Sequence, residues 1–275
     1  SKVTKYDNPN RTLTDPYEGQ QLGEIWGYVV DGYFKTDEEA RNYKVDQSFV
    51  NQMINASALD NGLHAGDLKF VDLDGNNKIE QTTSANDRKD MKVIGNSLPR
   101  YNYNFGISAD WYGIDFSVLF QGIGKQNWYP GAETSMFWGP YSRPYASFIP
   151  SDFMSQVWSE ENTDAYFPRP RGYVALGSNR ELAVVNTKYL QNLAYCRLKN
   201  LSIGYTLPDK WLSKIGFEKI RVYFSGENLL TFTKLHSDYI DPEQASASNS
   251  WKTSKSDANI YPWAKTYSFG VDITF

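Results

Sequence analysis

The chain has 275 residues and a formal net charge of −4, and aromatic residues make up 16% of it. The negative charge argues against a broad basic surface for nucleic acid, and the single cysteine, Cys196, excludes an internal disulfide. No segment approaches the roughly 18 apolar residues of a transmembrane helix. Tyr and Trp concentrate where water meets an apolar phase, so the composition points to a binding surface or a membrane interface.

The first 99 residues show only short local patterns, and one of these is a candidate calcium loop, GDLKFVDLDGNNKIE at 66–80. Carboxylate and amide oxygens at alternate positions can surround Ca²⁺, with a backbone carbonyl and a later carboxylate completing the shell. The candidate ligands are Asp72, Asp74, Asn76, Lys78 through its carbonyl, and Asp87. Asp90 is an alternative to Asp87.

The loop departs from a standard calcium loop in two ways. Gly75 comes before the usual glycine position, which is occupied by Asn77, and Thr83 stands where a bidentate Glu is usual. The competing interpretation is an Asp/Gly turn that needs no metal.

Five later segments alternate apolar and polar residues, which predicts β-strands with one apolar and one polar face. They are RYNYNFGISADWY (100–112), IDFSVLFQG (114–122), RLKNLSIGYTLP (197–208), EKIRVYFSGENL (218–229) and KTYSFGVDITF (265–275). Their length exceeds the usual five or six residues of a globular strand and suits a tilted strand that crosses a bilayer, which needs about 9–11 residues. In the last segment we expect Tyr267, Phe269, Val271 and Ile273 to face lipid.

The links between these segments differ sharply in length. The short ones are 111–113 and 208–217, and the long ones are 1–99, 127–187 and 231–263. Outer-membrane barrels have short periplasmic turns and long extracellular loops. If Phe275 is periplasmic, every long link falls outside the cell and every short link falls inside. We therefore expect an extracellular loop region at 1–99 and barrel strands at 100–275, with the two later long links as extracellular loops.

The long loops are rich in aromatic and small polar residues, and flat rings can stack on sugars, grip peptide side chains or contact a partner protein. The candidate rings are Trp138, Tyr141, Tyr145 and Trp251. Packing of loop on loop is the favoured interpretation for any single ring. On the polar face of the fourth strand, Arg221 and Glu227 are candidates to line a cargo path or to form a salt-bridge network in a barrel lumen.

Stretches that span nearly the whole chain carry a resemblance to a known family. They are LGEIWGYVVDGYFKTDEEA (22–40), GDLKFVDLDGNNKIE (66–80), IGNSLPRYNYNFGISADWYGIDFSVLFQGIGK (94–125), VWSEENTDAYFPR (157–169), YLQNLAYCRLKNLSIGYTLP (189–208), RVYFSGENLLTFT (221–233), DYIDPE (238–243) and YPWAKTYSFGVDITF (261–275). In order and spacing they resemble the C-terminal part of SusC/RagA-type TonB-linked outer-membrane transporters of Bacteroidetes.

The resemblance implies an all-β fold, the last five or six strands of a transmembrane antiparallel barrel of about 22 strands with long extracellular loops. It implies import of oligosaccharides or peptides across the outer membrane. The implied partners are a SusD-like surface lipoprotein as a lid, the TonB–ExbB–ExbD complex through an N-terminal part without counterpart here, the rest of the barrel, and membrane lipid. No nucleic acid and no required cofactor are implied.

Two other functions compete with import. The first is a soluble, aromatic-rich β-sheet module that binds glycans without transporting them. The second is an enzyme such as a glycosidase, which needs paired carboxylates, and the candidates are Glu160, Glu161, Asp238, Asp241 and Glu243. The sequence contains no nucleophile elbow, glycine-rich phosphate loop or His/Cys metal cluster, so we expect a protein that is not an enzyme.

Overall fold

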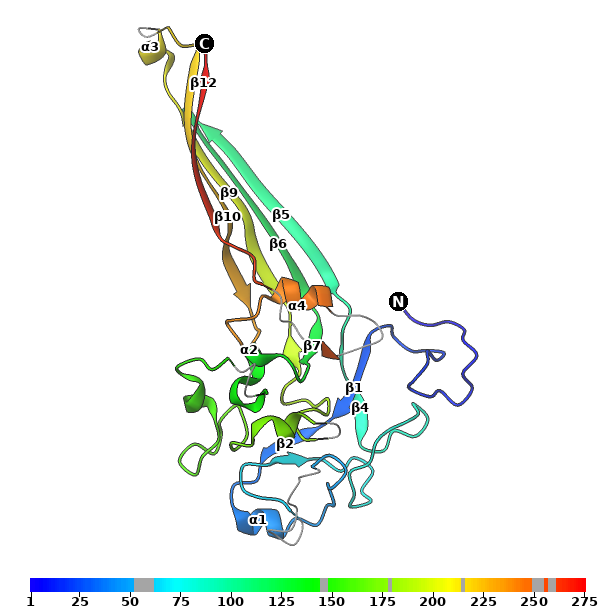
Figure 1. Cartoon of the computed structure of the whole chain (residues 1–275). Helices are drawn as coiled ribbons and strands as arrows, with labels where there is room; N and C mark the ends of the chain where they lie inside the picture. Colours follow the sequence, from blue (N-terminus) through cyan, green and yellow to red (C-terminus); the bar gives the residue numbers. More distant parts are fainter. Residues whose placement is uncertain (52–61, 144–147, 178–179, 214–215, 249–254, 257–260) are drawn as a thin grey trace.

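The computed structural model describes the chain except for residues 52–61, 144–147, 178–179, 214–215, 249–254 and 257–260. One long antiparallel sheet rises from a body of loops (Figure 1). The N-terminus lies beside the loops, and the C-terminus lies at the far end of the sheet. No helix in the described part of the chain is long and apolar enough to cross a membrane.

All five predicted strands are present in the long sheet. They are β5 (Arg100–Trp111), β6 (Ile114–Lys125), β9 (Tyr195–Thr206), β10 (Lys219–Thr233) and β12 (Thr266–Thr274). Their order across the sheet is β12-β10-β9-β6-β5, and every neighbouring pair is antiparallel. The 12 residues of β5, at about 3.3 Å per residue, span about 40 Å. Such a strand is long enough to cross a bilayer at a tilt.

The turn between β5 and β6 consists of Tyr112 and Gly113, which both have positive φ angles, 46° and 83°. Two consecutive left-handed residues form the type of two-residue turn whose twist matches that of the flanking strands. The tight link expected from the sequence is therefore a β-hairpin, and it lies at the same end of the sheet as the C-terminus (Figure 1).

The register of the five strands pairs residues of similar polarity across neighbouring strands. One row across the apolar face is Ala109, Phe116, Ile203, Phe224 and Phe269, and one row across the polar face is Ser108, Ser117, Ser202, Ser225 and Ser268. Because side chains alternate between the faces of a strand, this register places all the apolar members on one side of the sheet and the hydroxyls on the other.

The apolar face carries large side chains that remain exposed. Phe269 is 82% exposed, and Ile107, Trp111 and Tyr267 are each at least 60% exposed. A water-soluble β-sandwich buries such a face against a second sheet. In the described part of the chain this face is not buried, which argues against the soluble module and fits a surface that meets lipid.

The remaining elements are short and belong to the loop body, apart from α3 at the far end of the sheet. They are β1 (Glu24–Tyr28), β2 (Val30–Tyr33), α1 (Asp37–Arg41), β3 (Leu68–Phe70), β4 (Met91–Asn96), β7 (Asn127–Pro130), α2 (Ser135–Trp138), η2 (Gly139–Tyr141), η3 (Phe153–Gln156), η4 (Gly172–Leu176), β8 (Gln191–Asn192), α3 (Asp209–Leu212), α4 (Pro242–Ser248) and β11 (Lys255–Ser256). β1 pairs with β4, β2 pairs with β3, and β7 lies between β8 and β11.

The loop body, defined here as the described parts of residues 1–99, 126–194 and 234–256, has one largely aromatic core shared by all three long loops. Phe70 comes from the first loop, Trp138 and Phe167 from the second, and Ile240 from the third, and all are buried in the same cluster. The Trp138 ring contacts the rings of Phe137 and Tyr189, with centroids 4.8 and 5.2 Å apart. The three loops therefore pack together around one core and do not form separate structures.

Replacing Trp138 with Ala is expected to destabilise the loop body by about 3–5 kcal/mol, because it empties a fully buried aromatic site. Hydrogen exchange of the amides in residues 127–142 of the protein measures the loss as faster exchange. Trp211→Ala is the matched control, because Trp211 lies in α3 at the other end of the sheet and is 61% exposed. Unchanged exchange in Trp138→Ala would show that this core does not stabilise the loops.

Candidate functional site

The polar face of the sheet carries an ion-pair network centred on Arg221 of β10. Its Nε and Nη2 atoms donate to the carboxylate of Asp115 on β6 at 2.7 and 2.5 Å, and its Nη1 atom donates to Asp272 on β12 at 3.2 Å. β9 lies between β6 and β10, so the guanidinium–carboxylate bridge crosses above it. Gly204 of β9 lies underneath, where a Cβ atom would overlap both Asp115 Oδ2 and Arg221 Nη2.

Arg221 thus belongs to a salt-bridge network, the second of the two roles expected for it. Glu227 lies on the same face, in register with Asn200 of β9 and Thr266 of β12, and is exposed. Within the described part of the chain it forms no ion pair. Contact between Glu227 and cargo stays a prediction.

A second network fastens the third long loop to the polar face near the loop body. Arg197 of β9 is only 2% exposed, and it donates to Asp241 at 2.6 Å, to Glu243 at 2.8 Å and to Thr231 at 3.0 Å. Lys199 donates to Glu243 as well, at 2.8 Å. We call this cluster the Arg197 latch, and it holds the first turn of α4 against the sheet.

The Arg197 latch gives Asp241 and Glu243 a structural role, because both carboxylates are paired with cations. The sequence offers them as acid–base candidates and does not single out Arg197 and Lys199. The sequence does show two cationic residues at the start of the third predicted strand, which could have indicated an ion-pair site. Nothing in the sequence, however, places that strand beside residues 241–243.

Two of the rings proposed to contact cargo or a lid are in fact interior residues of the loop body. Trp138 and Tyr141 are 0% and 1% exposed, and they donate to the backbone carbonyls of Gly131 at 2.9 Å and Pro168 at 2.6 Å. Buried rings cannot stack on a sugar or grip a peptide, so the prediction of a contact role is wrong for both. Tyr145 and Trp251 lie outside the described residues.

A buried ion cluster joins the first loop to the second. Arg171 contacts Asp67 and lies 3.1 Å from Glu181, while Arg169 donates to Asp67 at 2.6 Å. Asp67, Arg171 and Glu181 are all at most 1% exposed. Burial raises the pKa of Glu181 to about 7, although the positive charge of Arg171 opposes this shift. The cluster binds loop to loop, and no sequence pattern predicts it.

The candidate calcium loop brings three carboxylates together, but Asp90 takes the place expected for Asp87. Ligand oxygens of Asp72, Asp74 and Asp90 lie within 4.8 Å of one another, and Asp87 is not a member of this group. The backbone of Asp87 pairs with that of Ser84 in an isolated β-bridge. Asn76 donates to Asp74 at 3.1 Å, and the Lys78 amide donates to the Asn76 side chain at 2.8 Å. Hard carboxylate and amide oxygens suit Ca²⁺, so the donor set fits the ion.

Burial and backbone hydrogen bonds shift the pKa values of two carboxylates in this loop in opposite directions. Burial raises the pKa of Asp90, although the Glu80 and Leu73 amides donate to its carboxylate. For Asp72, burial also acts to raise the pKa, but amides of Asn77 and Gly75 outweigh it and lower the pKa. Asn77 has a φ of 62°, so it adopts the left-handed geometry expected at its place in the loop. Calcium binding at this loop stays a prediction.

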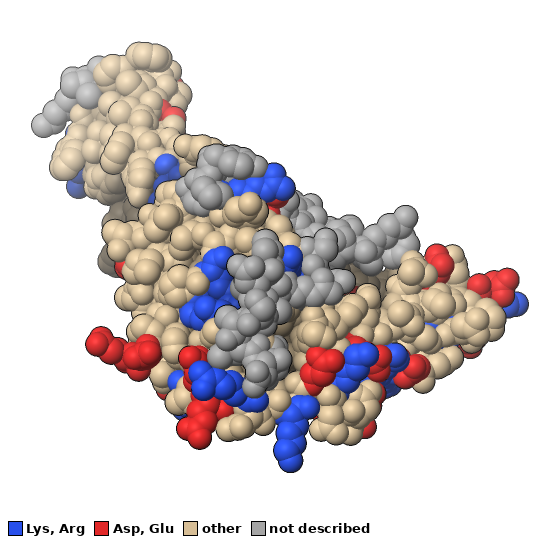
Figure 2. Space-filling model, turned by 60° about the horizontal axis from the view of Figure 1, so that its bottom comes forward, with Lys and Arg blue, Asp and Glu red and all other residues tan. Residues whose placement is uncertain are grey.

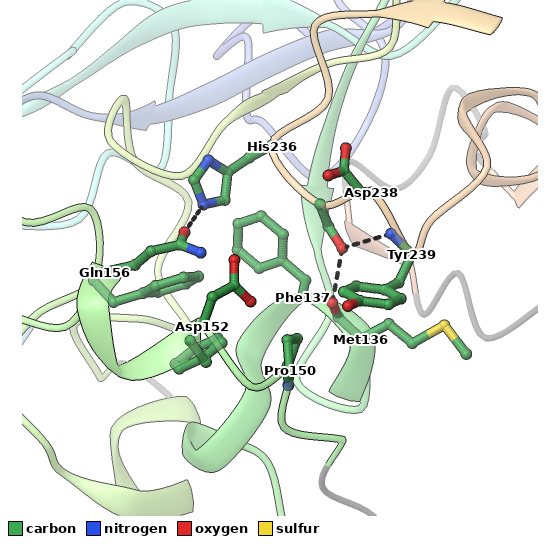
Figure 3. A pocket seen from close by; sticks show the side chains of 11 residues that line it. Met136, Phe137, Pro150, Asp152, Gln156, His236, Asp238 and Tyr239 are labelled. Carbon is green, nitrogen blue, oxygen red and sulfur yellow. Dashed lines mark hydrogen bonds between the residues drawn. The ribbon is translucent and has the colours of Figure 1, made fainter.

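A pocket opens in the loop body between the second and third long loops (Figure 3). Its walls are Met136, Phe137, Pro150, Asp152, Phe153, Gln156, Phe167, His236, Ser237, Asp238 and Tyr239. His236 is fixed by a 2.8 Å hydrogen bond with Gln156 and by stacking on Tyr166, with ring centroids 3.5 Å apart. Ser237 donates to the Met136 carbonyl at 2.9 Å, which ties the third loop to α2.

The surface of the loop body is not dominated by charge of one sign. Figure 2 turns this end of the molecule forward, and acidic and basic side chains alternate there within a surface that is mostly uncharged. Recognition at this surface therefore depends on local pockets more than on a long-range field.

An apolar face open to the surroundings, a polar face crossed by ion pairs, and a loop body at one end together define part of the wall of a transmembrane β-barrel. The comparisons with known proteins agree with this class. No protein-family model matches the chain. Two TonB-dependent receptors of Formosa agariphila, P3 and P39, are 28% and 26% identical to it, each over 94% of this chain. The chain spans 22% and 25% of their lengths.

Solved structures of the RagAB peptide importer have the same fold. The open-open state matches with a TM-score of 0.57 and 20% identity over 98% of this chain, and the closed-closed state with 0.55 and 21% over 99%. This chain covers 24% and 25% of those chains. The resemblance to the C-terminal part of SusC/RagA-type TonB-linked transporters is thereby confirmed, and the chain is similar to a segment that makes up about a quarter of such receptors.

Replacing Gly204 with Ala is expected to lower the free energy of unfolding of the full-length receptor by about 1–3 kcal/mol, because the new methyl group overlaps the Arg221–Asp115 bridge. Urea unfolding in lipid measures the change. Ser202→Ala, on the same strand and face, is the control. The loss should shrink when Gly204→Ala is combined with Asp115→Ala, which removes the overlapping carboxylate, and an equal loss in both backgrounds would contradict the clash.

The Asp72 loop is expected to bind Ca²⁺, and titration calorimetry of the full-length receptor measures the affinity. Asp90→Asn should weaken binding at least tenfold, whereas Asp87→Asn should leave it unchanged, because only Asp90 lies in the cluster. Affinity should also fall as the pH is lowered, since protons compete for the carboxylate of Asp90, whose pKa is raised. No calcium-dependent heat in the unmodified receptor would refute the site.

Proposed function

We propose that this chain forms wall, lumen lining and outer loops of a TonB-dependent outer-membrane importer that takes up oligosaccharides or peptides. The observation that carries the proposal is the exposed apolar face, which runs in register across five strands. Such a face is unfavourable in water and favourable against hydrocarbon. The receptors and the importer to which the chain is similar support the same conclusion.

The orientation we propose places the loop body outside the cell and the β5–β6 hairpin, α3 and the C-terminal end of β12 in the periplasm. Figure 1 supports it, because the long links gather at one end of the sheet and the short links at the other. Barrels of the outer membrane have this asymmetry between their two ends.

The partners we propose follow from the resemblance. A SusD-like surface lipoprotein would act as a lid, the TonB–ExbB–ExbD complex would supply energy through another part of the receptor, and further strands would close the barrel. We propose transport without bond chemistry, and the engagement of Asp241 and Glu243 in the Arg197 latch supports this.

Spin labels at Phe269 and Ser268 of the full-length receptor test the proposed membrane contact. A label at Phe269 should be accessible to oxygen dissolved in lipid, and one at Ser268 to a water-soluble nickel complex, because adjacent residues of a strand face opposite sides. Water access at both positions, together with folding in the absence of detergent, would favour the soluble glycan-binding module instead.

A further inference from the structure

The pocket in Figure 3 combines acidic and aromatic groups without a cation of its own. Asp152 and Asp238 contribute carboxylates, and Asp152 points toward the middle of the pocket (Figure 3). No Lys or Arg is among its described lining residues. Burial lowers the pKa of His236, although Asp238 opposes the shift, and this lowering disfavours a positive charge on the imidazole. The pocket thus presents net negative charge.

The cation nearby is already engaged elsewhere. Lys188, which acts electrostatically on His236, has its Nζ atom 4.8 Å from the ring centroid of Tyr33 and 5.6 Å from that of Tyr166. The same atom donates to the Ala165 carbonyl at 3.4 Å. In the described part of the chain, neither Asp152 nor Asp238 has a salt-bridge partner.

The walls of the pocket suit a cation carried on an apolar stem. Tyr239, which is 46% exposed, contributes an accessible ring to it, and the exposed Phe148 packs on Tyr239 with ring centroids 4.8 Å apart. Aromatic faces attract guanidinium and ammonium groups, and the methylene stem of a long basic side chain packs on apolar surface.

The size of the pocket limits its occupant. Water-sized spheres fill about 80 Å³ of it, and one water needs roughly 10–15 Å³ by this measure. The space accommodates the end of one long side chain. Residues 237–239 of the pocket follow the end of β10 by a few residues and come just before Asp241 of the Arg197 latch. The pocket is therefore connected, through a short segment of chain, to residues that contact the sheet.

We propose that this pocket binds the guanidinium or ammonium group of an arginine or lysine side chain in a peptide cargo. The inference rests on the proposed function as an importer, and it selects peptides with basic residues as the substrate class. Asp152 and Asp238 neutralise the charge of the bound group, and the exposed ring of Tyr239 packs against its stem. The similarity in fold to a peptide importer supports a peptide as the source of this side chain.

A randomised library of blocked pentapeptides, incubated with the full-length receptor in detergent, tests the proposal across all side-chain types at once. Mass spectrometry of the retained peptides should show arginine and lysine enriched about tenfold over glutamine and citrulline, which have similar shapes but no charge. Equal retention of arginine and citrulline peptides by the unmodified receptor would overturn the proposal.

The double variant Asp152→Asn/Asp238→Asn should lose this enrichment, and Glu161→Gln should keep it, because Glu161 is an exposed carboxylate of the same loop body outside the pocket. Enrichment that survives in the double variant overturns the proposal. The proposal is also overturned if the double variant binds peptides normally but has lost affinity for a SusD-like lipoprotein. In that case the pocket would bind a basic side chain of the lid protein and not one of the cargo. Spin labels at Phe269 that report lipid would show in either case that the membrane contact behind the proposed function is intact.

Discussion

The period-two alternation of the strands, kept in register across the sheet, is the constraint on which the rest of the structure depends. A shift of one residue between any two strands would move every apolar side chain to the polar side. The level rows of serines and of apolar residues show that no such shift occurs over the central part of the sheet. The ion pairs of Arg221 require this register, because they join residues on three strands. The Arg197 latch lies beyond two register shifts, at Leu119/Phe120 and Glu227/Leu230, which place Arg197 opposite Gln121 and Thr231 on the polar face.

The sheet and the loop body are stabilised in different ways. The sheet has ladder hydrogen bonds and ion pairs but an exposed apolar face, and its edge strands β5 and β12 each pair with one strand in the described part of the chain. The loop body instead has a core of buried aromatic side chains drawn from three segments far apart in the sequence. An ordered loop body can hold a pocket of fixed shape, whereas independent loops could not.

Sequence patterns are sufficient for the sheet and insufficient for the loops. Alternation locates all five strands within a few residues, since period and burial are local properties of a strand. The left-handed geometry of Asn77 also follows from its place in the turn. In contrast, the burial of Trp138 and Tyr141, the choice of Asp90 over Asp87, and the pairing of Arg197 with Asp241 depend on contacts between distant segments. An aromatic residue in a loop has the same sequence signal whether it is buried or exposed, so packing alone decides its role.

The bridge from Arg221 to Asp115 has a consequence for how the wall can deform. Because it passes over Gly204, it holds β6, β9 and β10 at a fixed stagger, and a slide of β9 by two residues would put the side chain of Ser202 or Thr206 under the bridge. Strands in this part of the wall can therefore bend or twist together but cannot glide past one another. In the importer that we propose, this sector of the wall would therefore be stiff.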